Sequence, residues 1–187
     1  MPALKVMTWN VENLFRPAPG APQLDQQRFQ QKVLFLANII NQQAPDVLAL
    51  QEVGGLEPLN DLQEALAGAY PHAAISQFPD SRGIRVAFLS KFAPTSSLNF
   101  VDFAPGPALD IHDLTGTGAS VPVTRMSRGA LRITVTKEGL TVTMITVHLK
   151  SKLLSFPRPG GTSFQPRNED ERAQVGGIAV LKRTAEA

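Results

Sequence analysis

An almost unbroken apolar run in the first third of the chain sets the tightest limit on the fold. Residues 46–53 place Val47, Leu48, Ala49 and Leu50 in succession before the polar pair Gln51-Glu52. Runs of this kind are typical of strands that are buried on both faces. Such a strand needs a packed layer above and below it, so the sequence predicts a sheet that is covered on each side.

Segments with helical spacing flank this strand. A helix is predicted from Asp25, which we expect to cap it, to about Gln43, and Pro45 stops it. A second helix is predicted over residues 56–67. Both show one apolar face, formed by Phe29, Val33, Leu36 and Ile40 in the first and by Leu59, Leu62 and Leu66 in the second.

The remaining pattern adds strands, loops and one more helix. Strands are predicted over residues 4–9, 73–76, 85–90, 130–136 and 140–148, with a turn at 80–83 and a hairpin turn at 137–139. Residues 16–23, 104–123 and 155–166 are predicted to be loops. The last helix is predicted over residues 168–184, with Val175, Ile178 and Leu181 as its core face. This order of elements indicates sheets covered by helices, in the α/β or α+β class.

Composition excludes several kinds of site. The 187 residues suit one domain, and a hydrophobic content of 43% is enough for a core. The absence of cysteine excludes disulfides, thiolate metal sites and a cysteine nucleophile, so a metal would need oxygen or imidazole ligands. The net charge of +2 permits an anionic substrate without requiring one. No apolar run is long enough to span a membrane, and the N-terminus lacks a secretory pattern, so we expect a cytoplasmic protein.

Polar residues follow the first two predicted strands. Asn10 and Glu12 come after the first strand, where they could reach a metal or a phosphate, although Asn10 and Asn13 could equally satisfy loop backbone. Glu52 ends the second strand, and its carboxylate suits magnesium, which takes one or two carboxylates together with water and substrate phosphate. The alternative for Glu52 is a solvated residue at a strand end. Sites in open sheets of this kind collect at such edges.

Basic residues flank the two strands predicted over residues 130–148. Arg128 precedes the first of these strands and could hold a phosphate through paired hydrogen bonds, or lie as an ordinary surface charge. His148 ends the second and could hydrogen-bond a phosphoryl oxygen, or be a partly buried strand-end residue. Lys150 adds positive charge. His72 and His112 have no such neighbours in the sequence and are assigned no role.

Together these segments resemble the endonuclease/exonuclease/phosphatase family, which includes deoxyribonuclease I. The resemblance rests on residues 9–14, 51–53 and 148–151, in that order and spacing, and it covers nearly the whole chain. It implies an α+β fold, a four-layer α/β sandwich of the deoxyribonuclease I type, in one domain over residues 1–187.

Particular roles follow from the same resemblance. Glu52 matches the metal-binding glutamate, and Asn10 matches an asparagine that contacts the metal or the scissile phosphate. His148 matches a histidine that hydrogen-bonds the phosphate and would act in catalysis with Asn10. Glu12, Arg128 and Lys150 match phosphate or substrate contacts. The implied cofactor is Mg²⁺, or Mn²⁺ or Ca²⁺ in its place.

The sequence also departs from the family. Members continue to a Gly-Asp-x-Asn motif and finish with a Ser-Asp-His motif, and neither occurs in this sequence. We therefore expect a chain truncated at its C-terminal side, with the second lobe incomplete and a second segment or chain needed to complete the fold.

The resemblance implies a metal-dependent phosphodiesterase, with nuclease-like hydrolysis of nucleic acids as the leading hypothesis. One alternative is a non-catalytic remnant that binds nucleic acid or phosphate. A further alternative is a phosphatase acting on phospholipids or inositol phosphates, because one fold serves many substrates in such families.

Overall fold

The apolar run forms an inner strand of a four-stranded mixed sheet. The computed structural model describes residues 2–103, 110–151 and 153–187. Strands β1 (Val6–Leu14), β2 (Val47–Val53), β3 (His72–Ile75) and β4 (Arg85–Ser90) form the sheet in the order β1-β2-β4-β3. β1 runs parallel to β2, and the other pairs are antiparallel. The parallel pair is joined through helix α1 (Gln23–Gln43), and helix α2 (Leu56–Ala65) follows β2.

Strand β2 is buried on both faces, as its sequence predicts. Leu48 and Leu50 pack in a cluster with the apolar faces of α1 and α2, while Val47 and Ala49 pack in a second cluster on the other side. All four side chains are at most 7% exposed. The alternation of side chains along a strand divides the run in this way, so one strand contributes to two cores.

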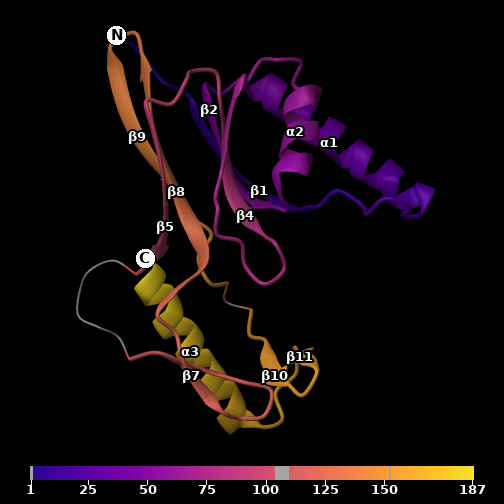
Figure 1. Cartoon of the computed structure of the whole chain (residues 1–187), viewed down its shortest axis with the longest axis vertical. Helices are drawn as coiled ribbons and strands as arrows, with labels where there is room; N and C mark the ends of the chain where they lie inside the picture. Colours follow the sequence, from indigo (N-terminus) through magenta and orange to yellow (C-terminus); the bar gives the residue numbers. More distant parts are fainter. Residues whose placement is uncertain (1, 104–109, 152) are drawn as a thin grey trace. The chain divides into compact units, whose positions relative to one another are not determined.

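A second sheet supplies the layer on the far side of β2. Its strands are β5 (Ser96–Asp102), β8 (Arg125–Lys137) and β9 (Leu140–Thr146), in the order β5-β8-β9. Leu131, Ile133 and Val135 of β8 pack against Val86 and Phe88 of β4. Figure 1 shows α1 and α2 on one side of β1, β2 and β4, and β8 and β9 on the other. This part of the chain therefore has three layers, helix on sheet on sheet, which confirms the α+β class.

The described chain divides into two compact units. Unit 1 comprises residues up to 100 and 128–148, and unit 2 comprises residues 101–127 and 149–187. Unit 2 contains two small hairpins and helix α3 (Glu169–Glu186). The hairpins are β6 (His112–Leu114) with β7 (Ser120–Pro122), and β10 (Phe156–Arg158) with β11 (Gly161–Ser163). In unit 2, Arg158 Nη1 lies 2.6 Å from Glu171 Oε1 and joins the second hairpin to α3. Whether residues 1–187 form one domain stays a prediction.

Several predicted elements need correction. Asp25 does not cap α1, because the helix begins two residues earlier and its N-cap position is Pro22, whose ring has no hydrogen-bond acceptor. The loop predicted over residues 104–123 contains β6 and β7, and its residues 104–109 lie outside the described part. The loop predicted over 155–166 contains β10 and β11, and β5 was not predicted.

Helix α3 also differs in its buried face. Val175 is buried as predicted, but Leu181 is 41% exposed and Ile178 is only half-buried. Ala179 and Glu186 are buried in their place. Asn168 caps the helix by accepting a hydrogen bond from Glu171 N at 2.8 Å.

Across residues 2–103, 110–151 and 153–187, no helix has both the length and the apolar character needed to cross a bilayer.

Candidate functional site

Irregular backbone at the adjoining ends of β1 and β2 builds the candidate site. Asn10 lies opposite Gln51 and Leu14 opposite Val53, so three residues of β1 stand against Glu52 alone. Within this bulge Glu12, Asn13 and Glu52 adopt left-handed backbone, with φ of 51°, 56° and 65°. Left-handed backbone costs a residue with a side chain about 1–2 kcal/mol. Strain of this kind persists only where the surrounding contacts fix it, and it gathers at functional sites.

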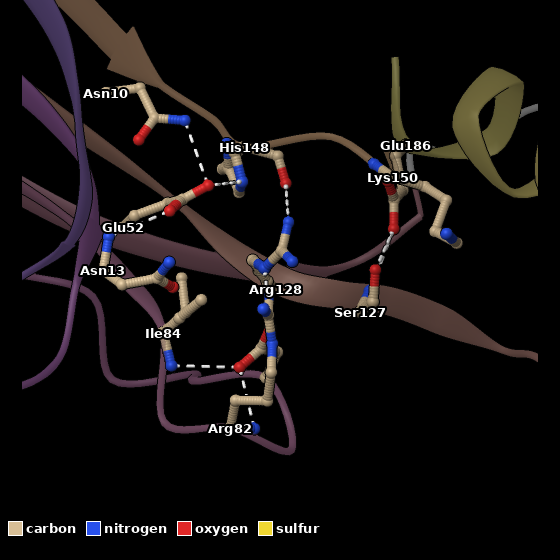
Figure 2. A network of polar contacts seen from close by, with 11 residues as sticks. Asn10, Asn13, Glu52, Arg82, Ile84, Ser127, Arg128, His148, Lys150 and Glu186 are labelled. Carbon is tan, nitrogen blue, oxygen red and sulfur yellow. Dashed lines mark hydrogen bonds and ion pairs between the residues drawn. The ribbon is translucent and has the colours of Figure 1, made fainter. Parts of the chain in front are cut away.

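The contacts that fix this backbone converge on Glu52 (Figure 2). Asn10 Nδ2 donates to Glu52 Oε1 at 3.0 Å, and Asn13 N donates to Glu52 Oε2 at 3.0 Å. Asn10 Oδ1 in turn accepts from Glu12 N at 2.9 Å. Partial burial raises the pKa of Glu52, but the two hydrogen bonds, with the electrostatic effects of His148 and Arg128, outweigh it and hold that pKa below its ordinary value. Glu52 is therefore ionised at neutral pH.

His148 follows β9 and faces the same carboxylate. Its Nε2 lies 3.3 Å from Glu52 Oε1, and both side chains are less than 20% exposed. Burial lowers the pKa of His148, the charge of Arg128 lowers it further, and the carboxylates of Glu52 and Asp80 only partly offset them. The imidazole is therefore neutral at pH 7, when one ring nitrogen donates a hydrogen bond and the other accepts one.

Arg128 joins this group through a carboxylate that sequence reasoning missed. Arg128 Nε donates to Asp80 Oδ2 at 2.9 Å, and Arg128 Nη1 donates to the carbonyl of His148 at 3.2 Å. Asp80 Oδ1 also accepts from the backbone N–H of Arg82 and of Ile84. Burial raises the pKa of Asp80, but these hydrogen bonds and the charge of Arg128 bring it below its ordinary value. Arg128 is thus a fixed, partly buried cation and not a loose surface charge.

A glycine lets β8 approach the segment that carries Asp80. Gly129 N donates to the carbonyl of Phe78 at 3.0 Å. A Cβ on Gly129 would lie 2.7 Å from Phe78 Cβ and 2.9 Å from the carbonyl oxygen of Phe100. Any larger residue there would push β8 away, so the glycine next to Arg128 makes the contact between Arg128 and Asp80 sterically accessible.

Gln51 ties the two sheets together beside the site. Its Nε2 donates to Thr8 Oγ1 of β1 at 3.2 Å and to Thr146 Oγ1 of β9 at 2.9 Å. The amide thereby links the strand that carries Asn10 to the strand that precedes His148. No local sequence pattern indicates this role, since the two threonine partners lie 43 and 95 residues away.

Two predicted site residues make other contacts. Glu12 is exposed, and its backbone takes part through its N–H to Asn10 and its carbonyl, which accepts from Lys32 Nζ. Lys150 belongs to unit 2, where its N–H donates to Glu186 and its Nζ donates to the carbonyl of Leu153 at 3.2 Å. The structure therefore brings together Asn10, Glu52, His148 and Arg128, the last through a main-chain contact.

The donor set fits a metal only in a limited sense. In the described part of the chain, no three His, Cys, Asp or Glu side chains form a group that could hold a metal ion. Glu52 supplies one ionised carboxylate, and each of its oxygens keeps a lone pair beyond the hydrogen bond it accepts. A single carboxylate suits magnesium that takes its other ligands from water and from a substrate phosphate.

Comparison with models of protein families identifies one family. A model described as the endonuclease/exonuclease/phosphatase family matches residues 7–181. No curated protein gives a match. Among solved structures, a mannosyl-6-phosphatase from Bacteroides thetaiotaomicron aligns with a TM-score of 0.52 at 17% identity, over 98% of this chain and 60% of that one.

Two further structures are similar. TDP2 from Caenorhabditis elegans aligns with a TM-score of 0.50 at 23% identity, over 79% of this chain and 35% of that one. An endonuclease/exonuclease/phosphatase family protein from Leptotrichia buccalis aligns with a TM-score of 0.48 at 17% identity, over 78% of this chain and 53% of that one. At these identities the likeness concerns the fold alone. The chain spans about half of the length of the Leptotrichia protein.

Proposed function

The chain belongs to the endonuclease/exonuclease/phosphatase family, and on that premise we propose that unit 1 binds and hydrolyses a phosphate ester, most readily a phosphodiester of nucleic acid. One observation supports this above all: Asn10, His148 and the carboxylate of Glu52 meet within hydrogen-bonding or ion-pair distance at the strand ends. Arg128 adds a fixed positive charge nearby. A group of this composition suits a phosphate, which brings negative charge and several acceptor oxygens.

Each residue has a distinct task in the proposed reaction. Glu52, with Asn10 beside it, would hold a divalent ion, Mg²⁺ in the first instance and Mn²⁺ or Ca²⁺ as substitutes. When bound, such an ion polarises a phosphoryl oxygen and offsets developing negative charge. His148, neutral at pH 7, donates a hydrogen bond to a phosphoryl oxygen, and the Arg128 cation stabilises the charge that builds up there.

Activation of the attacking water is assigned to no residue of this chain. The sequence contains neither the Gly-Asp-x-Asn nor the Ser-Asp-His motif. Under this proposal the chain hydrolyses its substrate slowly by itself, and a general base supplied by a second segment or chain would raise the rate. A cytoplasmic location, where magnesium and nucleic acid are both present, belongs to the same proposal.

A second candidate is a phosphate-binding protein without catalysis. The shortage of acidic groups around Glu52 among the described residues favours it. Binding would then depend on positive charge and would fall steeply as salt rises. Hydrolysis of a phospholipid or an inositol phosphate is a third candidate, and substrate competition separates it from the first.

The first prediction concerns hydrolysis by the purified chain. We expect magnesium-dependent cleavage of plasmid DNA and of bis(p-nitrophenyl) phosphate, with a chelator abolishing both. Glu52→Gln and His148→Gln should each lower the rate about 100- to 1,000-fold, because each removes a group aimed at developing charge. The assay should include p-nitrophenyl phosphate and mannose 6-phosphate as monoesters.

Matched controls keep this test specific. Glu138→Gln in the β8–β9 turn and His72→Gln in β3 change the same residue types away from the site, and both should retain the unaltered rate. Binding of a labelled oligonucleotide is measured in parallel. Binding that falls with salt, without hydrolysis of any substrate and without effect of Glu52→Gln, would contradict the enzyme proposal and support the binding one.

A further inference from the structure

Phe15 is an exposed aromatic residue beside the candidate site that the proposed reaction does not use. It comes two residues after Asn13, whose N–H donates to Glu52 at 3.0 Å, and its own N–H donates to the carbonyl of Asn13 at 2.9 Å. Phe15 is 37% exposed. Single exposed apolar residues are common on protein surfaces, so a role for Phe15 depends on what holds its ring and what lies beside it.

Two glycines bring backbone against the ring of Phe15. A Cβ on Gly54 would lie 2.7 Å from Cε1 and 2.8 Å from Cγ of the ring, and a Cβ on Gly83 would lie 3.7 Å from Cε1. Gly54 N also donates to the carbonyl of Leu14 at 2.9 Å. Any side chain at position 54 would displace the ring. The ring is therefore positioned before a ligand arrives, which lowers the entropy cost of binding.

The turn that contains Gly83 also carries an exposed cation, Arg82. Asp80 fixes this turn, because its Oδ1 accepts from the N–H of Arg82 at 2.9 Å and from that of Ile84 at 3.0 Å. In the described part of the chain, the Arg82 side chain has one long contact, from Nη2 to Asp80 Oδ2 at 3.4 Å, and it is 59% exposed. The same oxygen accepts from Arg128 Nε at 2.9 Å. Arg82 therefore keeps hydrogen-bond donors for a ligand.

An aromatic ring and a cation at the rim of a phosphate site suit a strand of nucleic acid. Bases of any sequence stack on aromatic side chains, and arginine binds backbone phosphates. Burial is the main cause of the lowered pKa of His148, and the charge of Arg82 contributes to it, which places that charge near the site. A sugar monophosphate or a phospholipid has no base to stack, so the pair favours nucleic acid among the candidate substrates.

We propose that Phe15 and Arg82 form a nucleotide subsite, in which a base next to the scissile phosphate stacks on Phe15 and a neighbouring phosphate contacts Arg82. This subsite rests on the proposed hydrolysis of nucleic acid and specifies the substrate as an unpaired strand. A base inside a duplex is stacked between its neighbours and must leave the stack to reach a protein ring. Single strands should therefore bind more tightly than duplexes.

The test is binding of a labelled single-stranded oligonucleotide to the full chain, followed by fluorescence anisotropy over a range of salt concentrations. Phe15→Leu should weaken binding about tenfold to a hundredfold, the loss expected for one stacked base. Arg82→Gln should lower the slope of log affinity against log salt by about 0.7, because one phosphate contact is lost. An oligonucleotide of abasic residues should lose no affinity on Phe15→Leu, since it has no base to stack.

The matched controls are Phe35→Leu and Arg28→Gln on α1. Phe35 is 59% exposed and the Arg28 side chain 69% exposed, so both remove the same chemistry from a surface away from the subsite. Both variants should bind the oligonucleotide as the unaltered chain does. Gly54→Ala should weaken binding as Phe15→Leu does, because the added Cβ displaces the ring.

Several results would overturn the subsite. Equal weakening of normal and abasic oligonucleotides by Phe15→Leu would show that Phe15 supports the fold alone, and equal salt slopes for Arg82→Gln and Arg28→Gln would remove the phosphate contact. Phe15-dependent binding to phosphatidylglycerol vesicles, without binding of oligonucleotides, would favour a lipid instead. If the expected binding effects appear but the chain hydrolyses no oligonucleotide, the proposed hydrolysis is wrong and the subsite stands.

Discussion

Asp80 shows how one residue supports the candidate site without belonging to it. Its carboxylate accepts from Arg128 and from two backbone N–H groups of its own turn, and it is 10% exposed. Because Arg128 also donates to the carbonyl of His148, Asp80 fixes the cation that holds the main chain at His148. Loss of this carboxylate should therefore affect both the fold and the site.

We predict that Asp80→Asn lowers the free energy of unfolding by about 1–3 kcal/mol at pH 7, because it leaves the partly buried Arg128 without its charged partner. The pKa of Asp80 is lowered in the folded chain, so its contribution is complete above the ordinary value near 3.8 and is lost as pH falls through the lowered value. Urea unfolding measures the free energy of unfolding of the unaltered chain and of Asp80→Asn. The difference between them should be smaller at low pH than at pH 7.

Asp25→Asn is the control for this change. Asp25 lies 3.8 Å from Arg28 in an exposed pair, so its replacement should cost less than about 1 kcal/mol. Equal effects of the two substitutions would show that the Asp80 pair contributes no more than a surface pair.

Local sequence predicts some site residues and hides others. Asn10, Glu52 and His148 could be predicted as candidates because each follows an apolar segment and because together they match the family pattern. Asp80 could be predicted only as a turn residue, since its partner Arg128 is 48 positions away and nothing near Asp80 indicates it. The left-handed backbone of Glu52 could not be predicted either, because it results from the bulge in β1 opposite Glu52 and not from a glycine.

At the scale of elements, the end of α1 illustrates how tertiary contacts supply what local sequence lacks. No basic residue lies in its last turn, yet Lys5 Nζ donates to the carbonyl of Gln43 and Lys91 Nζ to that of Ala44. Cations at this end complement the helix dipole. Ala44 itself closes the helix in left-handed backbone, with φ of 45°.

We predict that Ala44→Gly stabilises the protein by about 1 kcal/mol, because glycine adopts left-handed backbone without the steric cost of a Cβ. Gln31→Gly, at an exposed position inside the same helix, should instead destabilise by about 0.5–1 kcal/mol. Thermal unfolding followed by circular dichroism compares the two. A fall in stability for both would mean that Ala44 is not strained.

The predictability of elements follows their length and pattern. Long segments with clear periodicity, such as α1, α2 and β2, lie close to their predicted bounds. β6, β7, β10 and β11 have three residues each, too few to show a period. β5 was missed because its Ser-Ser-Leu-Asn-Phe sequence mixes polar and apolar residues without a buried face: Leu98 and Phe100 are both more than a third exposed.

At the scale of the whole molecule, two apolar clusters share β2 and β4. One includes Leu36 of α1 and the other Ile133 of β8, and alternate residues of the two shared strands enter each. Trp9, the one tryptophan of the sequence, packs at the border of the first cluster. A substitution that disrupts the packing of one cluster should therefore lower the stability of both clusters.

We predict that Leu36→Ala and Ile133→Ala each destabilise unit 1 by about 2–5 kcal/mol and shift one common transition in Trp9 fluorescence. Leu34→Ala, at a side chain that is 63% exposed, should change stability by less than about 0.5 kcal/mol. If Ile133→Ala left the unfolding transition in Trp9 fluorescence unchanged, the two clusters would unfold independently.

The path of the chain between the units has a consequence for synthesis. Residues 101–124 of unit 2 are translated before β8 and β9, which belong to unit 1 from Arg128 onward. A nascent chain emerging from the ribosome therefore has β2 and β4 long before the strands that cover Val47 and Phe88. Until those strands are synthesised, this apolar face is exposed, and we expect chaperones that bind newly made proteins to bind it.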